Sequence, residues 1–179
     1  MMALETAEFQ RLIAEHQRMV FSIALRVAGE YGAAEEVAQD VFLELFRSAE
    51  KLEDEHHIRF WLRRVTVHRA TDVLRKQRRQ PEVDADEWMD EVHALPTSAE
   101  DEAVNASVAA RLEELLRTLP EQMRVVVVLR YQEDMSPEEI ARLLSQPLAT
   151  VKSNLQRGLR LMRRKAEVTM KEYVRDGRA

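Results

Sequence analysis

The sequence has 179 residues, no cysteine and a formal net charge of −5 at pH 7. This length allows one domain or two small ones, and the lack of cysteine excludes disulfides and cysteine metal sites. No apolar run is long enough to cross a bilayer, and the first residues are unlike a signal peptide, so we expect a cytoplasmic protein without membrane insertion. Four glycines and frequent Ala, Leu, Glu and Arg are typical of an all-α chain.

Charge is distributed unevenly along the chain. Residues 59–79 hold eight basic side chains and one acidic one, and residues 149–165 hold six basic side chains and no acidic one. Residues 81–105, which lie between them, hold nine acidic side chains and no basic one. Two separated basic stretches predict two contacts with a polyanion such as nucleic acid, although each could also be an ordinary solvated helix surface.

The first two predicted helices cover residues 6–28, up to Gly29, and residues 34–47. The second has apolar residues at the i, i+3, i+4 and i+7 positions of a core-facing stripe. Leu43 departs from this stripe, because it lies on the outer side of the helix with Glu36, Gln39 and Asp40. The pattern leaves two interpretations open: an isolated exposed leucine, or the apolar centre of a surface that docks on a partner.

Residues 58–79 predict a third helix, with Phe60 and Trp61 as core anchors. Its basic residues alternate with polar side chains, which suits contacts with both phosphates and bases. The basic residues are Arg59, Arg63, Arg64, Arg69, Arg75, Lys76, Arg78 and Arg79, and the polar side chains among them are Thr66, His68, Thr71 and Asp72. The alternative is a basic helix that only balances the acidic residues of the first two helices.

Residues 81–105 predict a flexible acidic linker, because they contain two prolines and no sustained periodicity. Residues 106–119 form an amphipathic helical pattern. The apolar run at 125–129 fits either a strand or a buried helix. We favour the helix, because Pro120 precedes the run and the neighbouring segments are helical in pattern.

Residues 136–164 predict a helix-turn-helix. Ser136 and Glu139 have the spacing of a capping box, and Pro137 suits the first helical position. Pro147 ends this helix, and a basic second helix begins near Ala149. Four apolar residues are expected on the buried side of the second helix: Val151, Leu155, Leu159 and Met162.

The order of these parts resembles the bacterial RNA polymerase sigma factors of the extracytoplasmic-function (ECF) group of the sigma-70 family. The resemblance rests on four stretches: AEEVAQDVFLELFR (34–47), FWLRRVTVHRATDVLRKQRR (60–79), LRTLPEQMRVVVVLRYQEDMSPEEIARLL (116–144) and TVKSNLQRGLRLMRR (150–164). It implies an all-α protein of two small helical domains, 1–80 and 106–179, joined by the flexible acidic linker 81–105, with the helix-turn-helix in the second domain.

The resemblance also implies a role for each surface. The residues that match the family's docking surface on core RNA polymerase are Glu36, Gln39, Asp40 and Leu43. The third predicted helix matches the segment that recognises the minus-ten promoter element, with Arg64, His68, Arg69, Asp72, Arg75 and Lys76. The second helix of the helix-turn-helix matches the reader of the minus-thirty-five element, with Thr150, Lys152, Ser153, Asn154, Gln156, Arg157 and Arg160. Two residues depart from the family pattern, because asparagine is common at His68 and arginine at Asn154.

Core RNA polymerase, promoter DNA and an anti-sigma factor are the partners that the resemblance implies. No catalytic residue, metal, cofactor or small-molecule substrate is expected. The main alternative is a helix-turn-helix regulator that does not depend on core polymerase and binds a palindrome as a dimer. An enzyme is disfavoured, because the histidines form no metal-ligand motif and the sequence contains no glycine-rich phosphate loop.

Overall fold

The computed structural model describes residues 6–48, 54–79 and 99–175, with side chains placed for residues 108–168 of the last stretch. Every regular element in these ranges is an α-helix, which confirms the expected all-α class. The helices are α1 (Thr6–Ala28), α2 (Tyr31–Ser48), α3 (Glu55–Arg79), α4 (Ala99–Arg117), α5 (Glu121–Tyr131), α6 (Pro137–Leu144) and α7 (Leu148–Arg175). None of these helices combines the length and the apolarity needed to cross a membrane.

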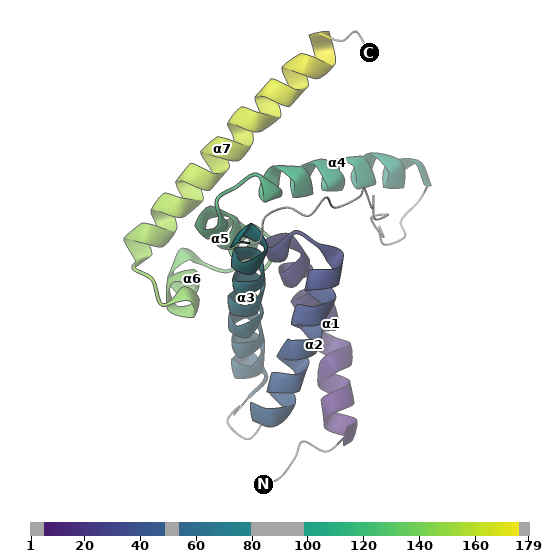
Figure 1. The fold of residues 1–179 in the computed structure, drawn as a ribbon, viewed down its shortest axis with the longest axis vertical. Helices are drawn as coiled ribbons and strands as arrows, with labels where there is room; N and C mark the ends of the chain where they lie inside the picture. Colours follow the sequence, from purple (N-terminus) through teal and green to yellow (C-terminus); the bar gives the residue numbers. More distant parts are fainter. Residues whose placement is uncertain (1–5, 49–53, 80–98, 176–179) are drawn as a thin grey trace.

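The first three helices form a bundle in which each helix packs against the other two (Figure 1). The predicted apolar stripes of α1 and α2 face each other in its core, where Val20, Ile23, Val37 and Leu45 are fully buried. Gly29 closes α1 with a φ of 84°, a left-handed conformation that glycine adopts without strain, and its N–H donates to the Leu25 carbonyl at 2.8 Å. The short turn that follows leads directly into α2.

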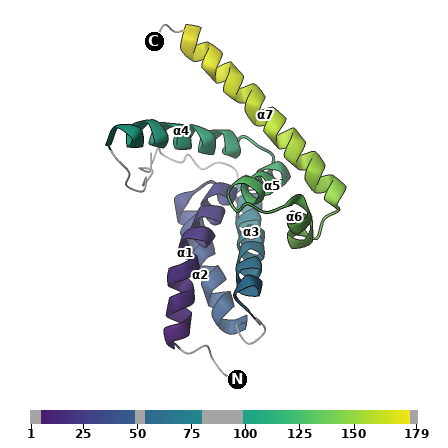
Figure 2. The same ribbon diagram turned by 180° about the vertical axis from the view of Figure 1, so that it is seen from behind.

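The other four helices form the second half of the molecule. Helix α5 packs against α6 and α7, while α4 runs across the end of the three-helix bundle and α7 extends away from it (Figures 1 and 2). The apolar run Val125, Val126, Val127, Val128 and Leu129 is buried throughout and is helical. The run is therefore the buried helix that we favoured over a strand.

One continuous hydrophobic core joins the two halves of the molecule. It includes Leu12 and Leu62 from the three-helix bundle together with Val126 and Ile140 from α5 and α6. Helices α1 and α3 contact α5 and α6 respectively. We call this contact region the seam; the sequence alone could not indicate whether the two halves pack together.

Two sequence predictions differ from the structure in detail. Helix α4 begins at Ala99, so residues 99–105 of the predicted linker are helical; residues 80–98 lie outside the described residues. Phe60 and Trp61 are half-buried and pack against the core, which makes them peripheral rather than central anchors.

Candidate nucleic-acid and docking interfaces

Local sequence chemistry explains the shape of the helix-turn-helix, formed by α6 and α7. The Ser136 hydroxyl accepts from the Glu139 N–H at 3.2 Å, and the Glu139 carboxylate accepts from the Ser136 N–H at 2.7 Å. This is the predicted capping box, and the hydrogen bond from the Ser136 backbone lowers the pKa of Glu139. Ser145 then takes the left-handed conformation at φ 53°, ψ 44°, in a turn that contains no glycine.

The exposed side of α7 carries most of the predicted minus-thirty-five contacts. Thr150, Lys152, Gln156, Arg157 and Arg160 are exposed, and Ser153 is half-buried beside them. We call these six residues the recognition face. Lys152 lies 3.7 Å from Glu138, whereas Arg157 and Arg160 form no ion pair with any residue that the structure describes. The recognition face therefore presents hydroxyl, amide and basic groups together at the start of the helix.

Helix α7 is rotated relative to the sequence prediction. Asn154, an expected DNA contact, is only 6% exposed, whereas Leu159, expected to be buried, is 37% exposed. The cause is Gly158, which packs against α5 so closely that an added Cβ would lie 3.1 Å from Val127 Cγ2. The buried side therefore centres on Asn154, Leu155 and Gly158, and Asn154 is not available on the recognition face.

The residues predicted to dock on a partner form a continuous exposed stripe on α2. Glu36, Gln39 and Asp40 are exposed, and Leu43 is 53% exposed at its centre. The sequence prediction missed Phe46, which is also exposed and packs edge-on against Phe9 with ring centroids 5.1 Å apart. The sequence did contain a signal for this position: Phe46 follows Leu43 by three residues, and residues with that spacing lie on the same face of a helix. We call Glu36, Gln39, Asp40 and Leu43 the docking stripe.

The predicted minus-ten contacts on α3, which we call the α3 face, differ in their surroundings. Arg64, His68, Asp72 and Lys76 are exposed. Arg69 instead donates to Asp40 of the docking stripe at 3.0 Å and to Glu44 at 2.5 Å, and the hydrogen bond with Glu44 raises the pKa of Arg69. The structure thus joins one predicted DNA contact to one predicted docking residue.

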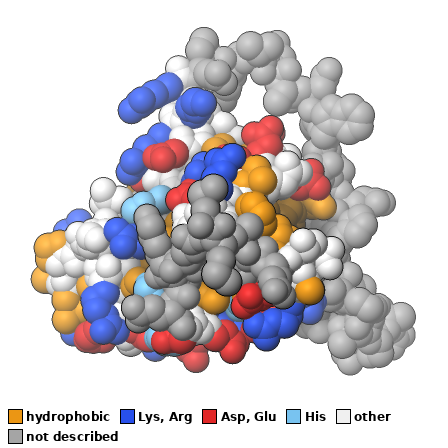
Figure 3. Space-filling view, turned by 90° about the horizontal axis from the view of Figure 1, so that it is seen from below, with side chains coloured by type: hydrophobic (Ala, Val, Ile, Leu, Met, Phe, Trp, Pro, Cys, Tyr) orange, Lys and Arg blue, Asp and Glu red, His pale blue; other side chains and the backbone are white. Residues whose placement is uncertain are grey.

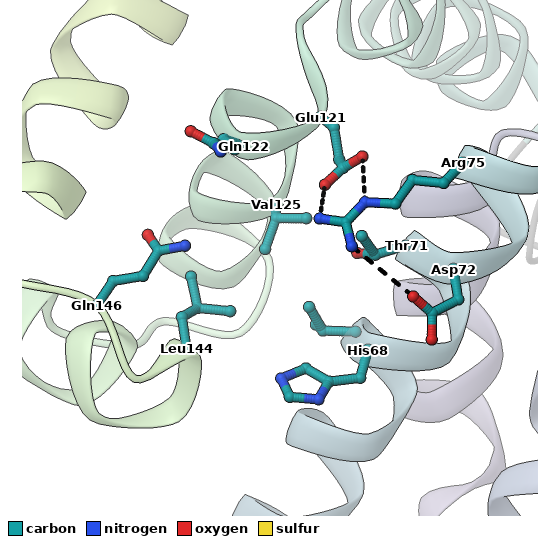
Figure 4. A pocket seen from close by; sticks show the side chains of 10 residues that line it. His68, Thr71, Asp72, Arg75, Glu121, Gln122, Val125, Leu144 and Gln146 are labelled. Atoms are coloured by element: carbon teal, nitrogen blue, oxygen red, sulfur yellow. Dashed lines mark hydrogen bonds and ion pairs between the residues drawn. The ribbon is translucent and has the colours of Figure 1, made fainter. Parts of the chain in front are cut away.

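Arg75 of the α3 face contacts the other half of the molecule. Its guanidinium donates to both carboxylate oxygens of Glu121, at 3.1 and 2.7 Å, and it also lies 3.8 Å from Asp72 (Figure 4). The hydrogen bond with Glu121 raises the pKa of Arg75. Glu121 begins α5, 46 residues further along the chain, so no local sequence signal indicates this pair.

Three further polar contacts cross the seam. Arg124, 3% exposed, donates to the Val27 carbonyl at 2.9 Å and to the Arg117 and Leu119 carbonyls on its own side. Arg63 pairs with Glu133 at 2.9 Å, and Arg26 donates to Gln132. Burial lowers the pKa of Arg124. Its only sequence signal was a single charge next to the apolar run of α5.

Charged side chains are mixed on the end of the three-helix bundle that lies opposite α7. Figure 3 shows acidic and basic side chains beside one another on the described part of this face. Within the described residues, no group of three or more histidine or acidic side chains is placed to hold a metal ion.

Comparison with known proteins identifies the class of the molecule. The family model of sigma-70 region 2 matches residues 12–80, and that of sigma-70 region 4 matches residues 109–162. The RNA polymerase sigma-E factor of Streptomyces coelicolor is 31% identical over 160 residues, which cover 89% of this chain and 86% of that protein. The chain belongs to the sigma-70 family of RNA polymerase sigma factors, in its ECF group.

Two other similarities extend over most of the chain. The ECF RNA polymerase sigma factor SigE of Mycolicibacterium smegmatis is 30% identical over 155 residues, which cover 87% of this chain but 60% of that relative. The sigma factor RpoE of Bartonella quintana, solved in complex with the anti-sigma factor NepR, has a TM-score of 0.70 at 16% identity, covering 89% of this chain and 97% of that one. The fold likeness therefore includes helices from both halves.

Proposed function

We propose that this chain is a promoter-specificity subunit that docks on core RNA polymerase and directs initiation by reading the minus-ten and minus-thirty-five elements. The single observation that carries this proposal is the recognition face, where exposed basic, hydroxyl and amide side chains begin the second helix of a capped helix-turn-helix. A helix of this kind fits the major groove, where such side chains discriminate bases by about 1–3 kcal/mol per good contact.

The docking stripe is the proposed contact with core polymerase. An exposed leucine bordered by carboxylate and amide groups suits a partner surface with an apolar pocket and a basic rim. Leu43 supplies the apolar area, while Glu36 and Asp40 supply charge. The close approach of Asp40 and Arg69 places this surface beside the α3 face, so both can act within one assembly.

The α3 face is the proposed contact with the minus-ten element. Arg64 and Lys76 are exposed cations suited to phosphates, and His68 and Asp72 are exposed polar groups suited to base edges. His68 replaces a common asparagine, and we expect this to change base preference rather than abolish binding.

The organisation of the proposed subunit follows from its two matched segments. We propose a minus-ten and docking domain, 1–80, and a minus-thirty-five domain, 106–179, with 81–105 as the connection between them. An anti-sigma factor is a proposed partner, since the similar Bartonella quintana protein was solved with one. The same proposal includes that the chain acts in the cytoplasm with RNA polymerase and has no enzymatic activity of its own.

A run-off transcription assay tests the proposal. Purified chain is added to core polymerase and a promoter library, together with the double variants Gln39→Ala/Asp40→Ala and Lys152→Ala/Arg157→Ala. We expect initiation from a defined promoter class, with a loss of about tenfold or more in each variant. Arg163→Ala is the matched control on α7, because this exposed arginine lies beyond the recognition face.

Failure of the folded chain to associate with core polymerase from its own host would contradict the proposal. The helix-turn-helix regulator would then be the better interpretation, with a stable dimer on a palindromic site as its signature.

A further inference from the structure

Two acidic residues of the second half hold arginines on the inner side of α3. Glu121, at the start of α5, binds Arg75 through both carboxylate oxygens, and Glu133, just after α5, binds Arg63. The side chains of the Arg63–Glu133 pair are 17% and 7% exposed, so water screens this pair little. Arg75 is half exposed, which leaves its pair open to competition.

We propose that Glu121 and Glu133 form an internal latch, which holds the two halves closed and occupies the α3 face until the chain opens. A carboxylate that binds one edge of a guanidinium through both of its oxygens has the geometry by which arginine also binds a phosphate. While Glu121 is bound, the Nε–Nη2 edge of Arg75 is occupied, so a DNA phosphate would have to displace Glu121 to bind that edge. This inference rests on the proposed function of the α3 face, and it adds intramolecular control to that function.

The second half narrows the space beside the latch. A cleft of about 250 Å³ separates α3 from α5 and the turn after α6, with His68 and Asp72 on one side and Gln122 and Gln146 on the other (Figure 4). Sites that enclose a drug-sized molecule start at roughly 300 Å³. His68 and Asp72 line this cleft and are also exposed to solvent, so the closed form narrows the space beside them without burying them.

The seam also contains buried polar atoms that destabilise the closed form. Gln146 Oε1 lines the cleft, and Arg124 Nε belongs to the guanidinium that crosses the seam; both atoms are buried without a hydrogen-bond partner among the described residues. Buried polar atoms without partners destabilise the arrangement that buries them. The seam therefore combines a shared apolar core with unsatisfied polar groups, so removing the latch should shift the balance towards the open form.

The lack of cysteine allows a direct distance measurement. Spin labels are attached to Glu35→Cys on α2 and Arg163→Cys on α7, two exposed positions outside the assigned surfaces. The label distance is compared between the full chain and the latch variant Glu121→Gln/Glu133→Gln. Affinity for a mixed-sequence single-stranded DNA oligonucleotide is measured on the same samples without polymerase. The control variant, Glu114→Gln/Glu167→Gln, removes the same charge from exposed positions away from the seam.

We expect a narrow distance distribution in the full chain and the control, and a broad one in the latch variant. DNA affinity should rise about fivefold in the latch variant over the control. An unchanged distance distribution would overturn the latch, and a broadened distribution with unchanged affinity would overturn the occlusion of the α3 face.

Two safeguards keep these outcomes interpretable. If the double variant does not fold, Glu121→Gln alone leaves the buried pair intact and should change both readouts in the same direction by less. Neither readout uses polymerase, so failure of the latch is distinguishable from failure of the proposed function, which the run-off assay reports.

Discussion

The two surfaces proposed to read DNA differ in what already contacts their basic side chains. On the recognition face of α7, Arg157 and Arg160 form no ion pair with any described residue. On the α3 face, Arg69 is held by Asp40 and Glu44, and Arg75 is held by Glu121. Two helices with similar basic composition therefore present different surfaces. The sequence therefore indicates where the basic side chains lie, but tertiary contacts determine which of them are already paired with acidic groups.

Breaking the seam should have the largest effect on stability. Arg124→Ala removes the buried guanidinium that donates to carbonyls on both sides, and leaves those carbonyls without partners. We expect a loss of about 2–4 kcal/mol in the free energy of unfolding, measured by urea denaturation. The exposed Arg117→Ala on α4 is the matched control. Equal effects of the two substitutions would mean that the halves are stable independently of the seam.

The docking stripe should respond specifically to loss of its apolar centre. Leu43→Ala should weaken binding to core polymerase about tenfold, because it removes roughly 1–2 kcal/mol of apolar burial in the complex. The fold should not change, since Leu43 is 53% exposed. Leu112→Ala replaces a similarly exposed leucine of α4 and serves as the control, with binding measured by fluorescence anisotropy. A similar loss in Leu112→Ala would remove the special role of the stripe.

The two regions should also differ in the pH at which they lose stability. His16 is buried in the three-helix bundle, and burial lowers its pKa below the ordinary value; the charges of Glu15, Arg59, Glu55 and Arg63 have smaller, partly opposing effects on this pKa. The unfolded chain binds the proton near pH 6.5 while the folded chain does not, so stability falls as pH drops below that value, by up to about 1.4 kcal/mol per pH unit.

Thermal unfolding between pH 7 and pH 5.5 checks this expectation, with His16→Gln showing a flatter profile. The pKa of Glu139 in the helix-turn-helix is also lowered. The stability that Glu139 contributes is fully present above the ordinary carboxyl pKa and is lost only at more acidic pH. If the unmodified protein and His16→Gln lost the same stability between pH 7 and pH 5.5, His16 would be excluded as the cause of that loss.

The smallest expected effect compares two of the three described residues with positive φ. Gly29, after α1, and Ser145, after α6, both have positive φ, but only glycine adopts it without strain. Ser145→Gly should stabilise the chain by about 0.5–1 kcal/mol, and Gly29→Ala should destabilise it by about 1 kcal/mol. An added Cβ at Gly29 would lie 3.7 Å from Arg124, an ordinary contact, so the cost there is one of backbone conformation. Thermal melts that show the same sign for both variants would contradict this reasoning.

Features determined by neighbours in the chain were predictable from the sequence. The capping box depends on Ser136 and Glu139, which are three positions apart, and the structure contains it. The buried helix at Val125–Leu129 also followed from its flanking proline and its helical neighbours.

Features determined by distant residues were not predictable. The rotation of α7 depends on the approach of Gly158 to Val127 of α5, which turns Leu159 outward and buries Asn154. Arg63 and Glu133 are 70 residues apart, and a single sequence contains no signal that pairs them. The docking stripe was predictable as a surface, but the link from Asp40 to Arg69 required the packing of α2 on α3.

Site-specific photocrosslinking to promoter DNA tests the central claim most directly. A photoreactive amino acid replaces the exposed Lys76 in one sample and the exposed Gln156 in another, and crosslinks are mapped with and without core polymerase. We expect position 76 to crosslink near the minus-ten element and position 156 near the minus-thirty-five element in the presence of polymerase, with the crosslink at position 76 absent in the free chain. Crosslinking of position 76 to DNA without polymerase, or no crosslink from position 156 in the complex, would contradict the account.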